Sequence, residues 1–357
     1  MACEVQSGAQ PHPLARNCVE CGDSLDLHER AGGESAHLPL EHRPSTLVGY
    51  LGAVYVADAQ GLVHGLNSQL QPFCAPLPFP EILEERVPVA LDGHLVAATS
   101  DGLLALDLID WAQVDTPRVT RLWPHNPGSA LAILDDVFAC VIRDEHSRLV
   151  AWRGLKPIAD APLEGPFSEG RPFVALAGEC ALVANSGASK VAVIDLKSNR
   201  QADTVDMGAN CEYASAGPTG IACLAETRGA KRLLGVSASG MRVLIPNLPR
   251  DVTWFQCVPG TAAVVWGNGS TMTVRTGRSS HLIPHPGNIG IARVVDRRAF
   301  AVAETAVSAS LLTVDLSTGK VANVGPLGAV GFTDLAICRT AVVAGNRREL
   351  RSMGLKP

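Results

Sequence analysis

The sequence predicts an all-β fold, a β-propeller of eight four-stranded blades, and three observations lead to this prediction. One kind of short apolar segment recurs eight times at a nearly constant pitch, each copy follows further runs of strand length, and the two ends of the chain carry complementary parts of one blade. Aromatic residues make up only 4% of the chain, which holds 34 Gly and 24 Pro. This composition favours many short strands joined by tight turns over a helical bundle.

The recurring segment sets the repeat length. Its copies begin at Gly61, Gly102, Arg148, Lys190, Lys231, Thr271, Ser310 and Glu349. Successive starts lie 39 to 46 residues apart, and a repeat of roughly 40 residues is typical of a four-stranded propeller blade. The longest interval runs from Gly102 to Arg148. An irregular repeat there would leave seven blades, which is the alternative count.

Each repeat contains further apolar runs that indicate its other strands. The segment at Lys190 follows CALVANS (180–186) and PFVALAG (172–178), and the segment at Ser310 is followed by a turn and the run KVANVGPL. The runs are short and rich in Val, Ala, Leu and Thr, as expected for strands buried on both faces. Gly240 and Gly319 occupy equivalent turn positions, where a hairpin needs positive φ. Small residues in the second runs are expected to let the blades approach closely. These residues are Ala57, Ala59, Ala97, Ala98, Ala184, Ala301, Ala303 and Ala344.

The two ends of the sequence complete one blade between them. The eighth copy stops after its third strand, while AHLPLEHRP (36–44) resembles the fourth-strand text SHLIPHPG (280–287). We therefore expect Ala36 to His42 to form the outer strand of the last blade, which closes the ring without an open sheet edge. The predicted organisation is an N-terminal segment, residues 1–35, followed by a propeller, residues 36–357.

Two stretches resemble known propeller repeats. VAVIDLKSNRQADTV (191–205) and LLTVDLSTGKV (311–321) are similar to the repeat text of YVTN-type and PQQ-like propellers, which are WD40-like, where an Asp-Leu-x-x-Gly or Asn turn joins the last two strands. The resemblance covers most of residues 46–357. It lacks the WD and GH signatures of WD40 repeats and the regular tryptophans of quinoprotein blades. It therefore implies the propeller architecture and no cofactor.

Charge and hydropathy narrow the class of function. The formal net charge is −5 with no basic stripe, so no nucleic-acid partner is expected. No stretch reaches the roughly 20 apolar residues of a membrane span, and the polar N-terminus does not resemble a secretion signal. These features predict a cytoplasmic protein, whose thiols stay reduced. Cys140, Cys180, Cys223 and Cys338 lie in apolar runs and are expected to be buried free thiols.

No residue of the ring is assigned a catalytic role. The histidines do not repeat at a common blade position, and the repeating Asp107, Asp195 and Asp315 are explained by carboxylates that bond their own turn backbone. The first strands offer few polar groups. Those groups are Gln256, Arg293 and Asp334. Nucleophile-elbow, P-loop and zincin motifs are missing, so a non-enzymatic role is favoured.

The stretch NCVECGDSL (17–25) contains one knuckle of a zinc site. Cys18 and Cys21 stand two residues apart and supply two of the four ligands that a structural zinc requires. His37 and His42 have the spacing to complete it, but Pro39 would break the helix on which a zinc finger carries its histidines. The closing strand also uses these residues. They are therefore not expected to be ligands.

The preferred completion is a small site formed by Cys3, Cys18, Cys21 and His28, with His12 as the alternative fourth ligand. A segment this short cannot form a stable hydrophobic core without a crosslink such as a bound metal, and these ligand types suit zinc. Two other interpretations stay open: a half-site completed by another chain, and a tail whose thiols bind no metal.

Two Pro-containing loops indicate where a partner could bind. LWPHNPG (122–128) and IPHPGN (283–288) present Trp123, His125 and His285 as partner-binding residues, although such side chains equally often pack against a neighbouring loop. We therefore predict a scaffold that binds partner proteins through its rim or face, with the zinc knuckle as a second docking element. The alternative is a propeller enzyme or small-ligand sensor with its site at the mouth of the central channel, because this fold hosts both.

Overall fold

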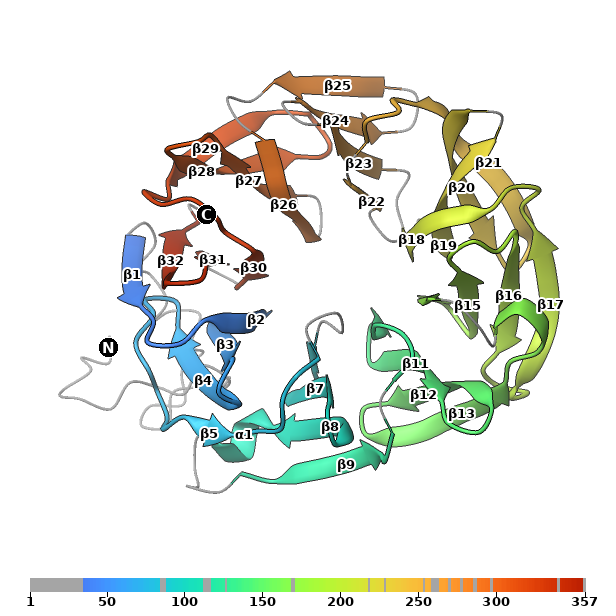
Figure 1. Cartoon of the computed structure of the whole chain (residues 1–357), viewed down its shortest axis with the longest axis horizontal. Helices are drawn as coiled ribbons and strands as arrows, with labels where there is room; N and C mark the ends of the chain where they lie inside the picture. Colours follow the sequence, from blue (N-terminus) through green and yellow to red (C-terminus); the bar gives the residue numbers. More distant parts are fainter. Residues whose placement is uncertain are drawn as a thin grey trace, which may run out of the picture.

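The computed structural model describes residues 35–83, 88–111, 117–125, 127–167, 171–217, 219–227, 229–252, 254–257, 263–268, 271–276, 279–284, 288–295, 298–338 and 341–355. These residues form eight four-stranded antiparallel sheets arranged as blades around one axis (Figure 1). The predicted eight-bladed propeller is confirmed, and the seven-bladed alternative is wrong. Cys3, Cys18, Cys21, His28 and His285 lie outside the described residues.

The first four blades follow one another along the chain, and each begins at the axis of the ring. Their strands, from innermost to outermost, are β2 Pro44–Tyr50, β3 Ala53–Asp58, β4 Leu62–Asn67 and β5 Leu77–Pro78; β6 Val89–Leu91, β7 His94–Thr99, β8 Gly102–Asp107 and β9 Val119–Trp123; β10 Ala132–Leu134, β11 Val137–Arg143, β12 Ser147–Arg153 and β13 Lys156–Pro162; β14 Pro172–Ala177, β15 Cys180–Asn185, β16 Lys190–Asp195 and β17 Arg200–Asp206. A short 3₁₀ turn, Gly165–Phe167, precedes β14.

The other four blades repeat this order, except that the last takes its outer strand from the start of the chain. Their strands are β18 Cys211–Ala216, β19 Ile221–Thr227, β20 Ala230–Ser237 and β21 Gly240–Leu248; β22 Trp254–Cys257, β23 Ala263–Asn268, β24 Thr271–Thr276 and β25 Ser279–Pro284; β26 Asn288–Val295, β27 Arg298–Glu304, β28 Ala309–Asp315 and β29 Val321–Pro326; β30 Asp334–Ile337, β31 Ala341–Gly345, β32 Glu349–Gly354 and β1 Ser35–Pro39. Every predicted repeat start lies within one residue of the start of a third strand.

The long interval between repeats does not disturb the blades. Its extra residues lie between β8 and β9, where α1, Leu108–Trp111, is formed. Leu108 and Trp111 are buried in the core between the first two blades, and the ring of Trp111 lies 5.9 Å from that of Tyr55. Within the described residues, no helix is long and apolar enough to span a bilayer, since α1 has four residues.

The predicted closing strand is confirmed in place, with slightly different bounds. β1 pairs with β32 from Ser35 opposite Met353 to Pro39 opposite Glu349. The strand ends at Pro39, although the amide of Leu40 still donates to the carbonyl of Arg348 at 2.8 Å. The side chains of Leu38 and Leu40 pack against the core between the last and first blades. This outer strand therefore joins the two ends of the chain with both backbone and apolar contacts.

One side-chain hydrogen bond also joins the closing strand to its neighbour. Nε2 of His37 lies 2.7 Å from Oε2 of Glu349, and Nε of Arg351 donates to Oε1 of the same carboxylate at 2.9 Å. Burial acts to raise the pKa of Glu349, but the bonds and charges of Arg351 and His37 outweigh it and hold the pKa below its usual range. His37 is thus engaged in closing the ring, in agreement with its exclusion as a zinc ligand.

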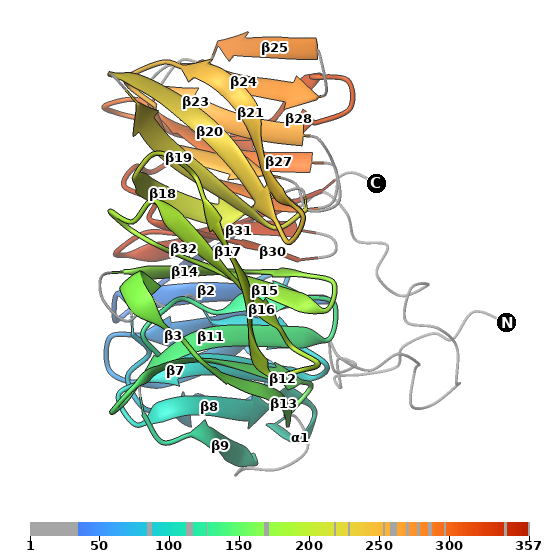
Figure 2. The same cartoon turned by 90° about the vertical axis from the view of Figure 1, so that its right-hand side faces the viewer.

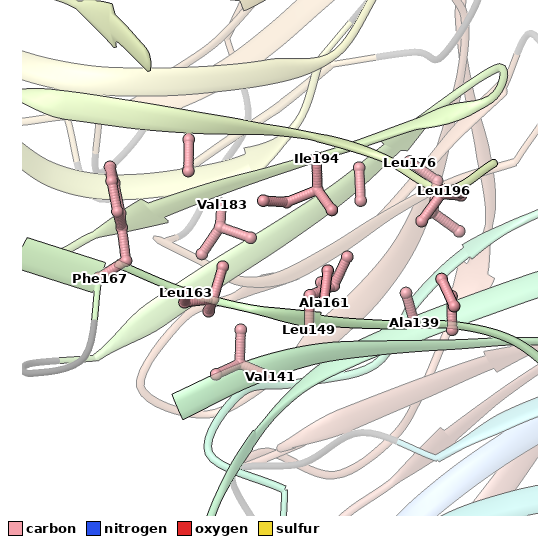
Figure 3. Packing of buried hydrophobic residues seen from close by; sticks show 14 residues of the cluster. Ala139, Val141, Leu149, Ala161, Leu163, Phe167, Leu176, Val183, Ile194 and Leu196 are labelled. Carbon is pink, nitrogen blue, oxygen red and sulfur yellow. The ribbon is translucent and has the colours of Figure 1, made fainter. Parts of the chain in front are cut away.

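The cores lie between blades, as the near-continuous apolar runs predict. Figure 3 shows one of them, in which Val141 and Leu149 of the third blade face Val183 and Ile194 of the fourth. Seven of the eight predicted spacer alanines are buried, whereas Ala59 is exposed in a turn because β3 ends one residue earlier. Small side chains therefore fill the blade interfaces, with Ala59 as the exception.

The turns explain most of the repeating polar residues. Gly240 and Gly319 have φ of +125° and +69°, as predicted. Oδ1 of Asp195 and of Asp315 each accept from the amide two residues further on at 2.8 Å. Asp107 departs from this pattern because α1 follows it instead of a hairpin turn. The two hairpin carboxylates therefore shape turns, which confirms the structural interpretation for them.

Candidate interaction surfaces

We call one face of the ring the top face. Its turns differ from the hairpin turns of Asp195 and Asp315, but many of them are also capped by a side chain. This face comprises the turns between the second and third strands of each blade and the connections between blades. Figure 2 shows α1 at the opposite face, on the right of that view. Several of these turns begin with a side chain that accepts from the amide two residues on. These side chains belong to Asp58, Thr99, Asp144, Thr305 and Asn346.

The rim residue Trp123 is packed between two blades. It ends β9, and its ring meets that of Trp152 edge-on, with centroids 6.4 Å apart at 80°. Trp152 in turn stacks on Phe138 at 5.0 Å and 9°. The half-buried indole of Trp123 therefore attaches the outer strand of the second blade to the third blade.

His125 lies two residues further on and is exposed at the top face. The loop that carries it is fixed to β11, because the amide of Gly128 donates to the carbonyl of Val141 at 2.6 Å and Oγ of Ser129 accepts from the amide of Val141 at 2.8 Å. The backbone amide of His146, followed by the charges of Arg148 and His125, lowers the pKa of Asp144. His125 thus projects from an anchored loop beside an acidic turn.

A row of three aromatic rings follows the innermost strands of three consecutive blades. Phe173 of β14 and Phe255 of β22 lie on either side of Tyr213 of β18, each with its ring centroid 5.4 Å from that of Tyr213. The interplanar angles of 70° and 87° are edge-to-face contacts, which aromatic pairs favour. Tyr213 nevertheless stays 46% exposed. The row places a preorganised, accessible aromatic side chain on β18, which is an innermost strand of the ring (Figure 1).

The backbone around Tyr213 is fixed from the neighbouring blade. The amide of Cys211 donates to the carbonyl of Ala188 at 2.9 Å, and the amide of Gly187 donates to the carbonyl of Cys211 at 2.7 Å. A register shift between Cys211 and Tyr213 re-aims the strand at this point. Because Gly187 and Ala188 belong to a top-face turn, Tyr213 lies towards that end of the inner wall.

Two of the polar first-strand residues noted in the sequence form an ion pair on the other side of the ring. Nη2 of Arg293 donates to Oδ1 of Asp334 at 3.1 Å, and the amide of Leu47 donates to Oδ2 at 2.9 Å. Burial raises the pKa of Asp334, opposed by Arg293 and the amides of Leu47 and Leu335. These groups join the seventh, eighth and first blades. Gln256, the third such residue, is half-buried in β22 and takes no part in this pair.

Only some of the site residues predicted from the sequence lie in the part of the chain that the structure describes. Trp123 and His125 share one loop region at the top face, and His285 lies beyond the described residues. Among the residues that the structure describes, no three His, Cys, Asp or Glu side chains gather as a metal site. The residue missed by sequence reasoning is Tyr213. The sequence feature that could have indicated Tyr213 is the run CEYASA of β18, which is the most polar of the innermost strands.

No protein-family model and no curated protein matches this chain. Among solved structures, the chain is similar to the computationally designed Ika8 protein, with a TM-score of 0.64 and 14% identity over 91% of this chain and 100% of that one. It is also similar to Sqt1 of Saccharomyces cerevisiae, with a TM-score of 0.59 and 11% identity over the same shares of the two chains. At these identities the likeness establishes the fold and nothing finer: the chain is a β-propeller.

Proposed function

We propose that this propeller is a non-enzymatic scaffold that binds partner proteins at its top face. The observation that supports this most directly is Tyr213, which stays exposed although two rings hold it edge-on. Tyrosine is enriched among the residues that dominate interface energies, because it offers a large contact area with few rotatable bonds. A side chain fixed in this way loses little conformational entropy when a partner binds. The exposed His125, on its anchored loop, adds a second contact at the same face.

Replacing Tyr213 with alanine is expected to weaken partner capture by roughly 30-fold, equivalent to about 2 kcal/mol at a central anchor. The measurement is co-purification of the tagged protein from its native host, with partners quantified by mass spectrometry. Tyr213→Phe keeps the ring and should retain most of the capture, and His125→Ala should cause a smaller loss.

The matched control is Leu282→Ala, which removes an exposed apolar side chain from the outer strand β25, where Leu282 is 67% exposed. Loss of the same partners in Leu282→Ala, or full retention of them in Tyr213→Ala, would contradict binding at the top face. Circular dichroism of each variant shows whether the fold is preserved.

The same proposal gives the N-terminal segment, residues 1–35, a zinc knuckle as a second docking element. It rests on ligand type and spacing, with Cys3, Cys18, Cys21 and His28 as the residues that would hold the metal. Elemental analysis should find one zinc per chain in protein purified without chelator and none in a Cys18→Ser, Cys21→Ser variant. A metal-free wild type would refute the site. A cytoplasmic setting fits the seven described cysteines, all of which are free thiols.

A further inference from the structure

Basic residues from the two ends of the chain lie in neighbouring segments at the top face, where the ring closes. His42 and Arg43 follow the closing strand β1, and Arg347 and Arg348 form the turn before β32. All four side chains are exposed. The bond from the amide of Leu40 to the carbonyl of Arg348, 2.8 Å long, holds the two segments side by side. We call these four residues the closure cluster.

Two of the three acidic side chains that the structure describes in residues 35–60 and 341–355, those of Asp58 and Glu349, are already engaged. Oδ2 of Asp58 lies 3.0 Å from Nε2 of His64, and Glu349 is bound by His37 and Arg351. Within residues 35–60 and 341–355, the only exposed acidic side chain is Glu41. No ion pair joins Arg347 or Arg348 to any residue that the structure describes. Arg347 and Arg348 therefore form a local positive surface on a chain of net charge −5.

A cleft continues from this surface along the first blade. The carbonyl of Arg43 accepts from the amide of Ala59 at 2.9 Å, so the cluster adjoins the turn Ala59–Gly61. That turn and Pro78–Glu81 line a cleft of about 550 Å³. Its walls are tied together by the bond from the amide of Phe79 to the carbonyl of Gly61, 2.8 Å long. A short extended segment could pair its acidic residues with the arginines and place uncharged residues in this cleft, because the carboxylate of Glu81 belongs to the cleft lining.

We propose that the closure cluster binds an acidic peptide segment of a partner protein. Guanidinium groups pair with carboxylates through two parallel hydrogen bonds, which gives arginine its preference for such ligands. The closure cluster extends over four residues only, whereas a nucleic acid needs a longer basic stripe and would be repelled by the remaining surface. This inference concerns different residues from the Tyr213 row, and purified components test it without any host partner.

The test is fluorescence anisotropy with a labelled deca-glutamate peptide, titrated with the full-length protein at 50 and 200 mM salt. We expect saturable binding that weakens at the higher salt. The double variant Arg347→Glu, Arg348→Glu should bind at least tenfold more weakly. The matched control, Arg200→Glu, Arg298→Glu, reverses two exposed arginines elsewhere on the ring and should change affinity by less than about twofold. Tyr213→Ala should leave peptide binding unchanged.

A variant that binds the peptide more tightly cannot owe its effect to misfolding, so it tests recognition directly. Glu41→Gln removes the exposed acidic side chain next to His42 and should tighten binding about twofold to threefold, because like charges repel. A labelled ten-nucleotide single strand, dT10, provides the competing ligand. Tighter binding of dT10 than of deca-glutamate would overturn the proposal in favour of a nucleic acid. Equal losses in the two double variants, or no saturable peptide binding, would overturn it as well.

Discussion

A chain that lacks residues 1–40 is expected to lose about 3 to 5 kcal/mol of unfolding free energy relative to the full chain, because the closing strand is removed. The loss combines the strand pairing of β1 with β32 and the burial of Leu38 and Leu40. It corresponds to a fall of roughly 5 to 10 °C in the unfolding midpoint, measured by circular dichroism. The free edge of β32 should also promote association, visible as light scattering.

The matched control is a shortened chain that begins at Ser35 and so keeps the whole of β1. It should unfold within about 2 °C of the full chain, since the propeller is complete from that residue on. A midpoint as low as that of the shorter chain would show that residues 1–34 stabilise the ring and would contradict the predicted division at residue 35.

Replacing Gly49 with alanine is expected to cost about 3 kcal/mol, because the seam between the first and last blades has no room for one methyl group. A Cβ on Gly49 would lie 2.2 Å from the carbonyl oxygen and 2.7 Å from the carbonyl carbon of Ile337. These are backbone atoms of β30, so a rotamer change cannot relieve the clash and the two inner strands must move apart. Urea unfolding followed by tryptophan fluorescence measures the loss.

Gly178→Asn provides the comparison for Gly49. No heavy atom lies within 4 Å of a Cβ placed there, and its φ of +60° suits asparagine better than most residues. The cost should stay below about 1 kcal/mol. If both substitutions cost the same, close packing at the seam is not what demands glycine at position 49.

The elements that could be predicted are strands whose burial produces a recognisable apolar run in a short stretch of sequence. The third strands were located within one residue, because a strand buried on both faces shows a continuous apolar run such as KVAVID. β5 was harder to locate, since it consists of Leu77–Pro78 in a Pro-rich stretch. The helix α1 was also missed. Its four residues are too few to show a helical period, and their burial beside Tyr55 depends on the neighbouring blade.

The candidate surfaces could be predicted less well, because they depend on contacts between blades. The sequence indicates a loop around Trp123 and His125, but only the structure shows that Trp123 ends β9 with its ring packed on Trp152 while His125 is exposed. Arg293 and Asp334 were noted as polar residues of first strands, and their ion pair across two blades spans 41 positions. The sequence does not distinguish Tyr213, since its neighbours Phe173 and Phe255 belong to other repeats.

The sequence by itself determined the eight blades, the strand order and the closure by the N-terminal strand, because repeat spacing and apolar runs are properties of the chain alone. Only the tertiary structure decided which side chains meet at the axis and at the top face. His42 and Arg43 adjoin Arg347 and Arg348 because the ring brings the two ends of the chain together. Periodicity fixes where strands begin, whereas the register and twist of neighbouring blades fix which side chains come into contact.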